Sequence, residues 1–185
     1  GLPIFASMIE ISELLHYPIK STAGILKQSI AVGPLGLNYD RIWGVFDLDG
    51  HCLTGREFPQ LLDVVADITE TTINILVKGE QTISIPIYTS SESKPLKIFK
   101  YDSNGSVINE EINAWFSNYL KIPCQLLKNN AAKKRPVLTK HGGDEATDQV
   151  AFADQAPVLI LSESSLSDLN DRLDQPIGME RFRPN

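Results

Sequence analysis

The chain has 185 residues, 42% of them hydrophobic and 22% charged, which is ordinary globular usage and enough for one large or two small domains. Its net charge of -6 argues against a general nucleic-acid or anionic-membrane binder, because nonspecific phosphate binding needs an excess of clustered lysine and arginine. The longest apolar runs fall far short of the roughly 20 residues that span a bilayer. We therefore expect a soluble, cytoplasmic protein with no nucleic-acid partner and no membrane span.

Residues 8–100 consist of short alternating segments separated by turn residues, a pattern typical of an antiparallel sheet. Ile9 and Ile11 indicate one strand and residues 42–47 a second. Asp49-Gly50 then reads as a hairpin turn, because glycine accepts the positive φ that such turns require. Later strands, with a turn at residues 78–80 between the last two, are predicted at residues 64–69, 71–77 and 82–87. So many short strands favour a β-barrel or a strongly curled sheet.

A first helix is predicted after this sheet. Asn109 can cap it, and the two glutamates that follow suit the positive end of a helix. Apolar residues then recur at helical spacing until Pro123, namely Ile112, Trp115, Phe116, Tyr119 and Leu120. The stripe predicts that one face of this helix packs on the sheet.

A second helix is predicted near the end of the sequence. Ser162 or Ser164 can cap it, and leucines recur at helical spacing before Pro176, at positions 166, 169 and 173. The apolar residues 157–161 run directly into this cap. We therefore expect a strand followed by a helix.

Residues 129–149 contain few apolar side chains and separate the two parts of the chain. The basic run at residues 133–136 could contact an anion, but a solvated linker is the preferred interpretation, because most charge runs face water. This gives a β-barrel-like domain at residues 8–128, a linker at residues 129–149 and the start of a second domain at residues 150–185.

Metal-binding patterns are weak in this sequence. Cys52 and Cys124 lie far apart without a CxxC pair, and the three histidines show no ligand spacing with them. Asp102-Ser103-Asn104-Gly105 begins like a calcium loop but lacks the later glutamate, so it is interpreted as a turn. We assign no metal ligand.

Phosphate-binding residue types gather early in the chain. After Pro18, Lys20 supplies an ammonium and Ser21 a hydroxyl, although the GxxxxGK[ST] pattern of a P-loop is absent. Arg41 and Arg56 flank the predicted Asp49-Gly50 hairpin, and guanidinium forks bind phosphate oxygens in pairs. A solvated strand end and surface ion pairs are the alternatives for these residues.

The last six residues combine two guanidiniums with an amide, at Arg181, Arg183 and Asn185. Such a cluster suits a ligand that carries an anion and amide-like edges. A fraying tail is the alternative.

Five segments of the sequence together resemble one known family: residues 17–21, 40–41, 53–56, 161–166 and 181–185. The family is that of MOSC-type molybdenum-cofactor proteins, in which a MOSC N-terminal β-barrel domain precedes a MOSC domain. The mitochondrial amidoxime-reducing component and its bacterial relatives have this arrangement. The resemblance covers nearly all of residues 8–185, and its most specific pieces are Lys20-Ser21 and the sequence RFRPN at its end. It implies an α+β fold, mainly antiparallel sheet or barrel with two helices, whose second, MOSC domain is truncated.

The resemblance also implies which residues bind the pyranopterin of the molybdenum cofactor. The cofactor's phosphate is held by Lys20, Ser21 and Arg41. Its pterin is held by Arg183 and Asn185. Weaker correspondences add Arg56 and Ser162. Cationic forks, hydroxyls and amides suit such a ligand, which is an anion with amide-like edges.

By resemblance, the parent protein is a molybdenum-dependent oxidoreductase that reduces N-hydroxylated small molecules with electrons from a donor protein. The family binds its metal through a cysteine located after the FRPN motif, and neither Cys52 nor Cys124 matches that position. We therefore expect this chain to hold no cofactor stably and to be inactive alone. The alternatives are a non-catalytic cofactor or sulfur carrier, related to the pyridoxal-phosphate-dependent cofactor sulfurases, and a plain interaction barrel.

Overall fold

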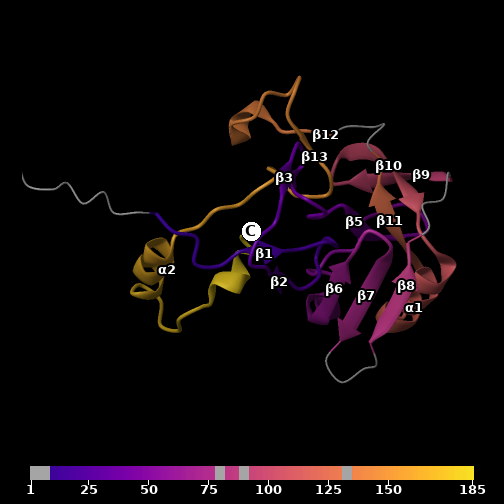
Figure 1. The fold of residues 1–185 in the computed structure, drawn as a ribbon, viewed down its shortest axis with the longest axis horizontal. Coiled ribbons are helices and arrows are strands. Elements are labelled where there is room, and N and C mark those ends of the chain that lie inside the picture. The colour runs from indigo at the N-terminus through magenta and orange to yellow at the C-terminus, as the bar shows by residue number, and fades with distance from the viewer. Residues whose placement is uncertain (1–8, 78–81, 88–91, 131–134) are drawn as a thin grey trace, which may run out of the picture.

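The protein is described here by a computed structural model, which covers residues 9–77, 82–87, 92–130 and 135–185. Antiparallel sheets that curl into a half-barrel, together with two α-helices, form the fold (Figure 1). This is the predicted α+β class. No helix within the described ranges is long and apolar enough to cross a membrane.

A four-stranded antiparallel sheet runs in the order β5-β11-β10-β9. Its strands are β5 (Trp43–Asp47), β11 (Cys124–Asn129), β10 (Tyr101–Val107) and β9 (Ser93–Ile98). The predicted hairpin turn follows β5, since Gly50 has a φ of 85° and Phe46 pairs with Cys52.

The turn predicted at residues 102–105 is wrong, because these residues lie inside β10. Gly105 pairs with Lys94 on one side and with Asn129 on the other. A Cβ atom on Gly105 would lie 2.8 Å from side chains of Leu127 and Leu96. Glycine here permits close packing between neighbours rather than a reversal of the chain.

A three-stranded sheet follows the predicted alternation closely, with strands β6 (Val64–Ile68), β7 (Thr72–Val77) and β8 (Ile83–Pro86). Alternate residues of β6 and β7 are buried, as expected for strands with one face on a core. The turn predicted at residues 78–80 falls outside the described residues.

Helix α1 (Glu110–Leu120) packs its apolar stripe on this core. The Asn109 Oδ1 accepts a hydrogen bond from the Glu111 backbone N–H at 2.7 Å, so the predicted cap is confirmed. Ile112, Phe116 and Leu120 are buried together with residues of β5, β6, β7, β8 and β11.

Six short strands complete the fold in pairs: β1 (Leu15–His16) with β2 (Ile25–Leu26), β3 (Val32–Gly33) with β4 (Gly36–Leu37), and β12 (Arg135–Pro136) with β13 (Gln149–Val150). The strand predicted from Ile9 and Ile11 is wrong. Both side chains are exposed and residues 9–12 pair with no strand among the described residues. An alternating apolar pattern is therefore not sufficient for a strand, which also needs a neighbouring strand to pair with.

Helix α2 (Glu163–Asn170) lies apart from the four-stranded sheet (Figure 1) and has no buried residue. The Ser162 Oγ accepts a hydrogen bond from the Ser165 N–H, which confirms the cap. The strand predicted at residues 157–161 is wrong, because this segment is irregular. Within the described part of the chain, the one backbone–backbone hydrogen bond of this segment is accepted by the Leu159 carbonyl from the Asn185 N–H, while the Leu159 N–H donates to the side-chain Oδ1 of Asn185.

The predicted linker at residues 129–149 contains β12, one residue of β13 and a buried cation. Arg135 is 6% exposed and donates to the backbone carbonyls of Ala151, Ala153 and Asp154. The solvated interpretation is therefore wrong at Arg135, while Lys133 and Lys134 lie outside the described residues. The domain boundaries themselves remain a prediction.

Candidate functional site

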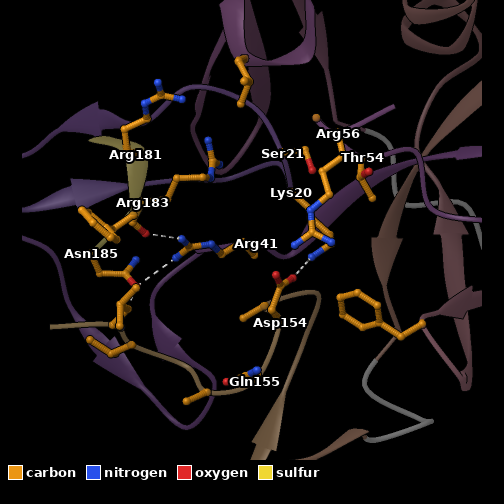
Figure 2. Close-up of a pocket in the computed structure, with 18 residues that line it drawn as sticks. Lys20, Ser21, Arg41, Thr54, Arg56, Asp154, Gln155, Arg181, Arg183 and Asn185 are labelled. Atoms are coloured by element: carbon orange, nitrogen blue, oxygen red, sulfur yellow. Dashed lines mark hydrogen bonds and ion pairs between the residues drawn. The ribbon is translucent and has the colours of Figure 1, made fainter. Parts of the chain in front are cut away.

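A cavity of about 590 Å³ brings together segments from both ends of the chain. Six of the seven residues predicted to bind cofactor line it, and Figure 2 shows how they lie: Lys20, Ser21, Arg41, Arg56, Arg183 and Asn185. The C-terminal end lies beside β1 (Figure 1), where the Asn185 amide is 3.5 Å from the Leu15 carbonyl. The fraying-tail alternative is thus not what the structure shows.

Lys20 is held at the cavity by the chain on either side of it. Ile19 is fully buried against the core, and the Lys20 N–H donates to the Trp43 carbonyl of β5 at 2.8 Å. The buried Lys20 ammonium forms an ion pair with the carboxylate of Asp154 (Figure 2). Burial opposes ionisation of Asp154, but the charges of Lys20 and then Arg135 outweigh it and lower the Asp154 pKa.

Arg41 is fixed by a buried carboxylate and by the C-terminal segment. The Asp40 carboxylate accepts from the Arg41 Nη1 at 2.5 Å and from the Tyr17 backbone N–H at 2.9 Å. The Arg41 guanidinium also donates to the Asn185 Oδ1 and to the Arg183 carbonyl, both at 3.0 Å. The Arg41 guanidinium therefore links Asp40 to the C-terminal segment.

Tyr17 brings two guanidiniums together at this site. The Cζ atoms of Arg41 and Arg183 each lie 4.4 Å from the centroid of its buried ring, a distance suited to cation–π contact. Burial, and then the nearby charge of Arg41, lower the Arg183 pKa. The Arg183 Nη2 also donates to the Thr22 carbonyl at 2.6 Å. Two cations are thus held close before any anion arrives.

Unusual backbone conformations concentrate at the cavity. Six non-glycine residues in the described ranges have a positive φ. Four of these line the cavity: Ser21, Arg41, Phe99 and Arg183. Such conformations cost stability, and residues held in them cluster at binding sites because the fold fixes side chains where a ligand needs them.

The charge of the lining is opposite to that of the whole chain. Five cations line the cavity with a single carboxylate, that of Asp154: Lys20, Arg41, Arg56, Arg181 and Arg183. Hydroxyl and amide groups of Ser21, Thr54 and Gln155 lie between them. In a protein of net charge -6 this lining favours an anionic ligand.

Asp154, Gln155, Thr54 and Phe99 line the cavity but were not predicted as site residues. Thr54 lies in one of the family-like segments, so its position carried a signal. For the other three the sequence had none, because their role depends on chain segments that only folding brings near Lys20.

Ser162 does not line this cavity, and its hydroxyl is used to cap α2. Neither cysteine lines it. Cys124 is buried in β11 against Ser117, whereas Cys52 lines an adjoining hollow of about 200 Å³. Burial raises the Cys52 pKa to about 11, so this sulfur is a weakly nucleophilic thiol at neutral pH.

Two domain families each match a separate part of the chain. Residues 8–123 match the MOSC N-terminal beta barrel domain, and residues 147–185 match the MOSC domain. Mitochondrial amidoxime reducing component 2 of Bos taurus is 34% identical over 189 residues, covering 95% of this chain and 54% of that protein. The human protein of that name is 30% identical over 189 residues, covering 95% and 55%.

Human molybdenum cofactor sulfurase is 29% identical over 176 residues, covering 88% of this chain and 19% of that protein. A solution structure from Bordetella bronchiseptica overlaps 57% of this chain and 92% of its own with a TM-score of 0.42 and 18% identity, which is too low to bear on the fold. The chain spans about half the length of the amidoxime reducing components that it matches.

Proposed function

Because the chain belongs to the MOSC family, with a MOSC N-terminal beta barrel domain followed by MOSC-domain sequence, we propose that its cavity binds the molybdenum cofactor of that family. Lys20, Ser21 and Arg41 bind the phosphate, and Arg183 lies against the pterin. The observation that carries the proposal is the meeting of six family-like residues, far apart in sequence, at one cationic cavity.

The chemistry of the lining fits a phosphate group. The Lys20 ammonium already pairs with the Asp154 carboxylate, so this position accepts an anion. Arg41 and Arg183 offer further N–H donors beside it. A phosphate that replaces the carboxylate at Lys20 gains charge-assisted hydrogen bonds from these groups.

Asn185 fits the pterin less well than its position suggests. Its Oδ1 accepts from both Arg41 and the Leu159 N–H, and its amide N–H₂ lies near the Leu15 carbonyl. The amide therefore has little capacity left for a ligand. We assign Asn185 a positioning role toward Arg41, and we leave Ser162 outside the cavity as a capping residue.

When bound, the cofactor supplies the redox chemistry, and the chain's own residues bind and orient it. The amidoxime reducing components among the relatives lead us to propose a small N-hydroxylated substrate for the whole protein, with electrons from a donor protein. We propose no metal ligand among Cys52 and Cys124, because neither thiol lines the cavity.

A cofactor or sulfur carrier is the second candidate function, because the similarity to molybdenum cofactor sulfurase extends over 88% of the chain. Both candidates need the anion-binding cavity. They differ in what the bound cofactor does next: a reductase turns over an N-hydroxylated compound, whereas a carrier releases the cofactor to another protein.

Phosphate binding by the purified chain tests the proposal that both candidates share. We expect Lys20→Ala and Arg41→Ala each to weaken the binding of phenyl phosphate about ten-fold or more, because each removes a charge-assisted hydrogen bond. Lys140→Ala is the matched control, since Lys140 is exposed and outside the cavity. Equal affinities in all four proteins would refute the proposal.

A further inference from the structure

Phe99 stands at the tip of the β9–β10 hairpin, where Ile98 pairs with Tyr101 and leaves a two-residue turn. It is the first residue of that turn, with a φ of 53°. Two-residue hairpin turns favour glycine or asparagine at this position, because a side chain at positive φ crowds the backbone. The hairpin would be easier to form with glycine at residue 99.

Phe99 gains little from burial to offset this conformation. The residue is 59% exposed, so most of its surface remains in water. A large apolar residue that is both exposed and held at positive φ is disfavoured by the backbone and by solvent. Its presence therefore calls for an explanation outside the folding of the hairpin.

The surroundings of Phe99 supply that explanation. It lines the main cavity and also the adjoining hollow beside Cys52. The Lys20 Nζ lies 5.3 Å from the centroid of its ring. A group attached to an anion bound at Lys20 would therefore come next to an aromatic ring that is partly free of protein contacts.

We propose that Phe99 is a ligand-binding residue whose ring packs against a planar, conjugated group of a ligand, the anionic part of which is bound at Lys20. This inference rests on the proposed function, because it needs the anion site. The planar group belongs either to the cofactor or to an aromatic substrate, and the two sources share this chemistry. Aromatic rings in contact attract each other beyond the effect of buried area.

A pair of phosphate esters tests the inference apart from the anion site. We expect the unaltered chain to bind phenyl phosphate about five-fold more tightly than methyl phosphate, as one aromatic contact predicts. In Phe99→Gly this preference should disappear, while methyl phosphate binds as before. The melting temperature of Phe99→Gly should not fall, because glycine accepts the positive φ of the turn.

Two further variants separate the ring from its other properties. Phe99→Leu keeps an apolar side chain at the same backbone strain, and it should lose most of the preference. Leu48→Ala removes an exposed apolar side chain outside the cavity and should keep the preference in full. An aromatic amidoxime without phosphate distinguishes the sources: binding that depends on Phe99 assigns the ring to the substrate, and no such dependence assigns it to the phosphate-bearing cofactor.

Equal binding of the two esters by the unaltered chain would overturn the inference about Phe99 and leave the anion site intact. Failure of both esters to bind would overturn the proposed function itself. Weaker binding of both esters by Phe99→Gly in equal measure would also contradict the inference, because it would place the effect of Phe99 on Lys20 rather than on the planar group.

Discussion

The core beneath α1 and the cavity around Arg41 are formed by different kinds of local structure. The core consists of regular strands and a helix, its buried residues are apolar, and they recur at the spacing of their element. The cavity consists of turns and chain ends, its lining is cationic, and four of its residues have a positive φ. Stability is concentrated in the first region and binding chemistry in the second, so variants should separate the two.

The largest effect is expected in the core. Phe116→Ala removes a fully buried ring of α1 and should lower the free energy of unfolding by about 3–5 kcal/mol. Phosphate affinity should be unchanged under conditions where the variant stays folded. Urea unfolding and ester binding measured on the same sample check both statements, and a parallel loss of affinity would show that core and cavity are coupled.

Arg135 should connect the two regions. Arg135→Met keeps much of the length of the side chain but leaves three backbone carbonyls without their donor, two of them on the buried residues Ala151 and Ala153, which should cost about 3 kcal/mol of unfolding free energy. Two of these carbonyls belong to Ala153 and Asp154 in the cavity lining, so phosphate affinity should change as well. Urea unfolding and phosphate titration of the same variant test this prediction. A loss of stability with unchanged phosphate affinity would show that Arg135 stabilises the fold without affecting the cavity.

His16 should make the fold sensitive to acid. Burial lowers its pKa from 6.5, against the opposing charge of Asp40. The unfolded chain therefore binds a proton at His16 more readily than the folded chain does. The contribution of neutral His16 to stability is fully present above about pH 6.5, and it decreases below that pH by at most about 1.4 kcal/mol per pH unit. His16→Leu should flatten this slope in urea unfolding at about pH 7 and about pH 5.5. An unchanged slope would assign the acid sensitivity to other groups.

Substitution of Asn185 should give the smallest effect, and this effect should be mainly a loss of phosphate affinity. Asn185→Ala removes the hydrogen bond that orients the Arg41 guanidinium, which predicts about five-fold weaker phosphate binding and a change in stability within about 1 kcal/mol. Titration with phenyl phosphate measures the first and thermal unfolding the second. Asn129→Ala, at the end of β11 and outside the cavity, is a matched amide control that should bind normally.

Prediction from the sequence succeeded where a structural signal is local. The alternation of β6 and β7, the Asn109 cap of α1 and the Asp49-Gly50 turn each depend on residues within one element, and each was confirmed. It failed where a segment needed a distant partner. Residues 157–161 have the apolar character of a strand, yet Leu159 alone among them forms a backbone–backbone hydrogen bond with another described residue. Gly105 pairs on both sides in β10 where a turn was expected.

The sequence by itself determined which chemical groups the site could use and which family-like segments carry them. Only the tertiary structure decided how they meet. Lys20 faces Asp154 across 134 positions, and Arg41 is oriented by Asn185 across 144. The reason is that the spacing of apolar residues along the sequence indicates which face of a helix or strand is buried. An ion pair, a buried guanidinium or a positive φ at Phe99 depends instead on where other segments of the chain pack.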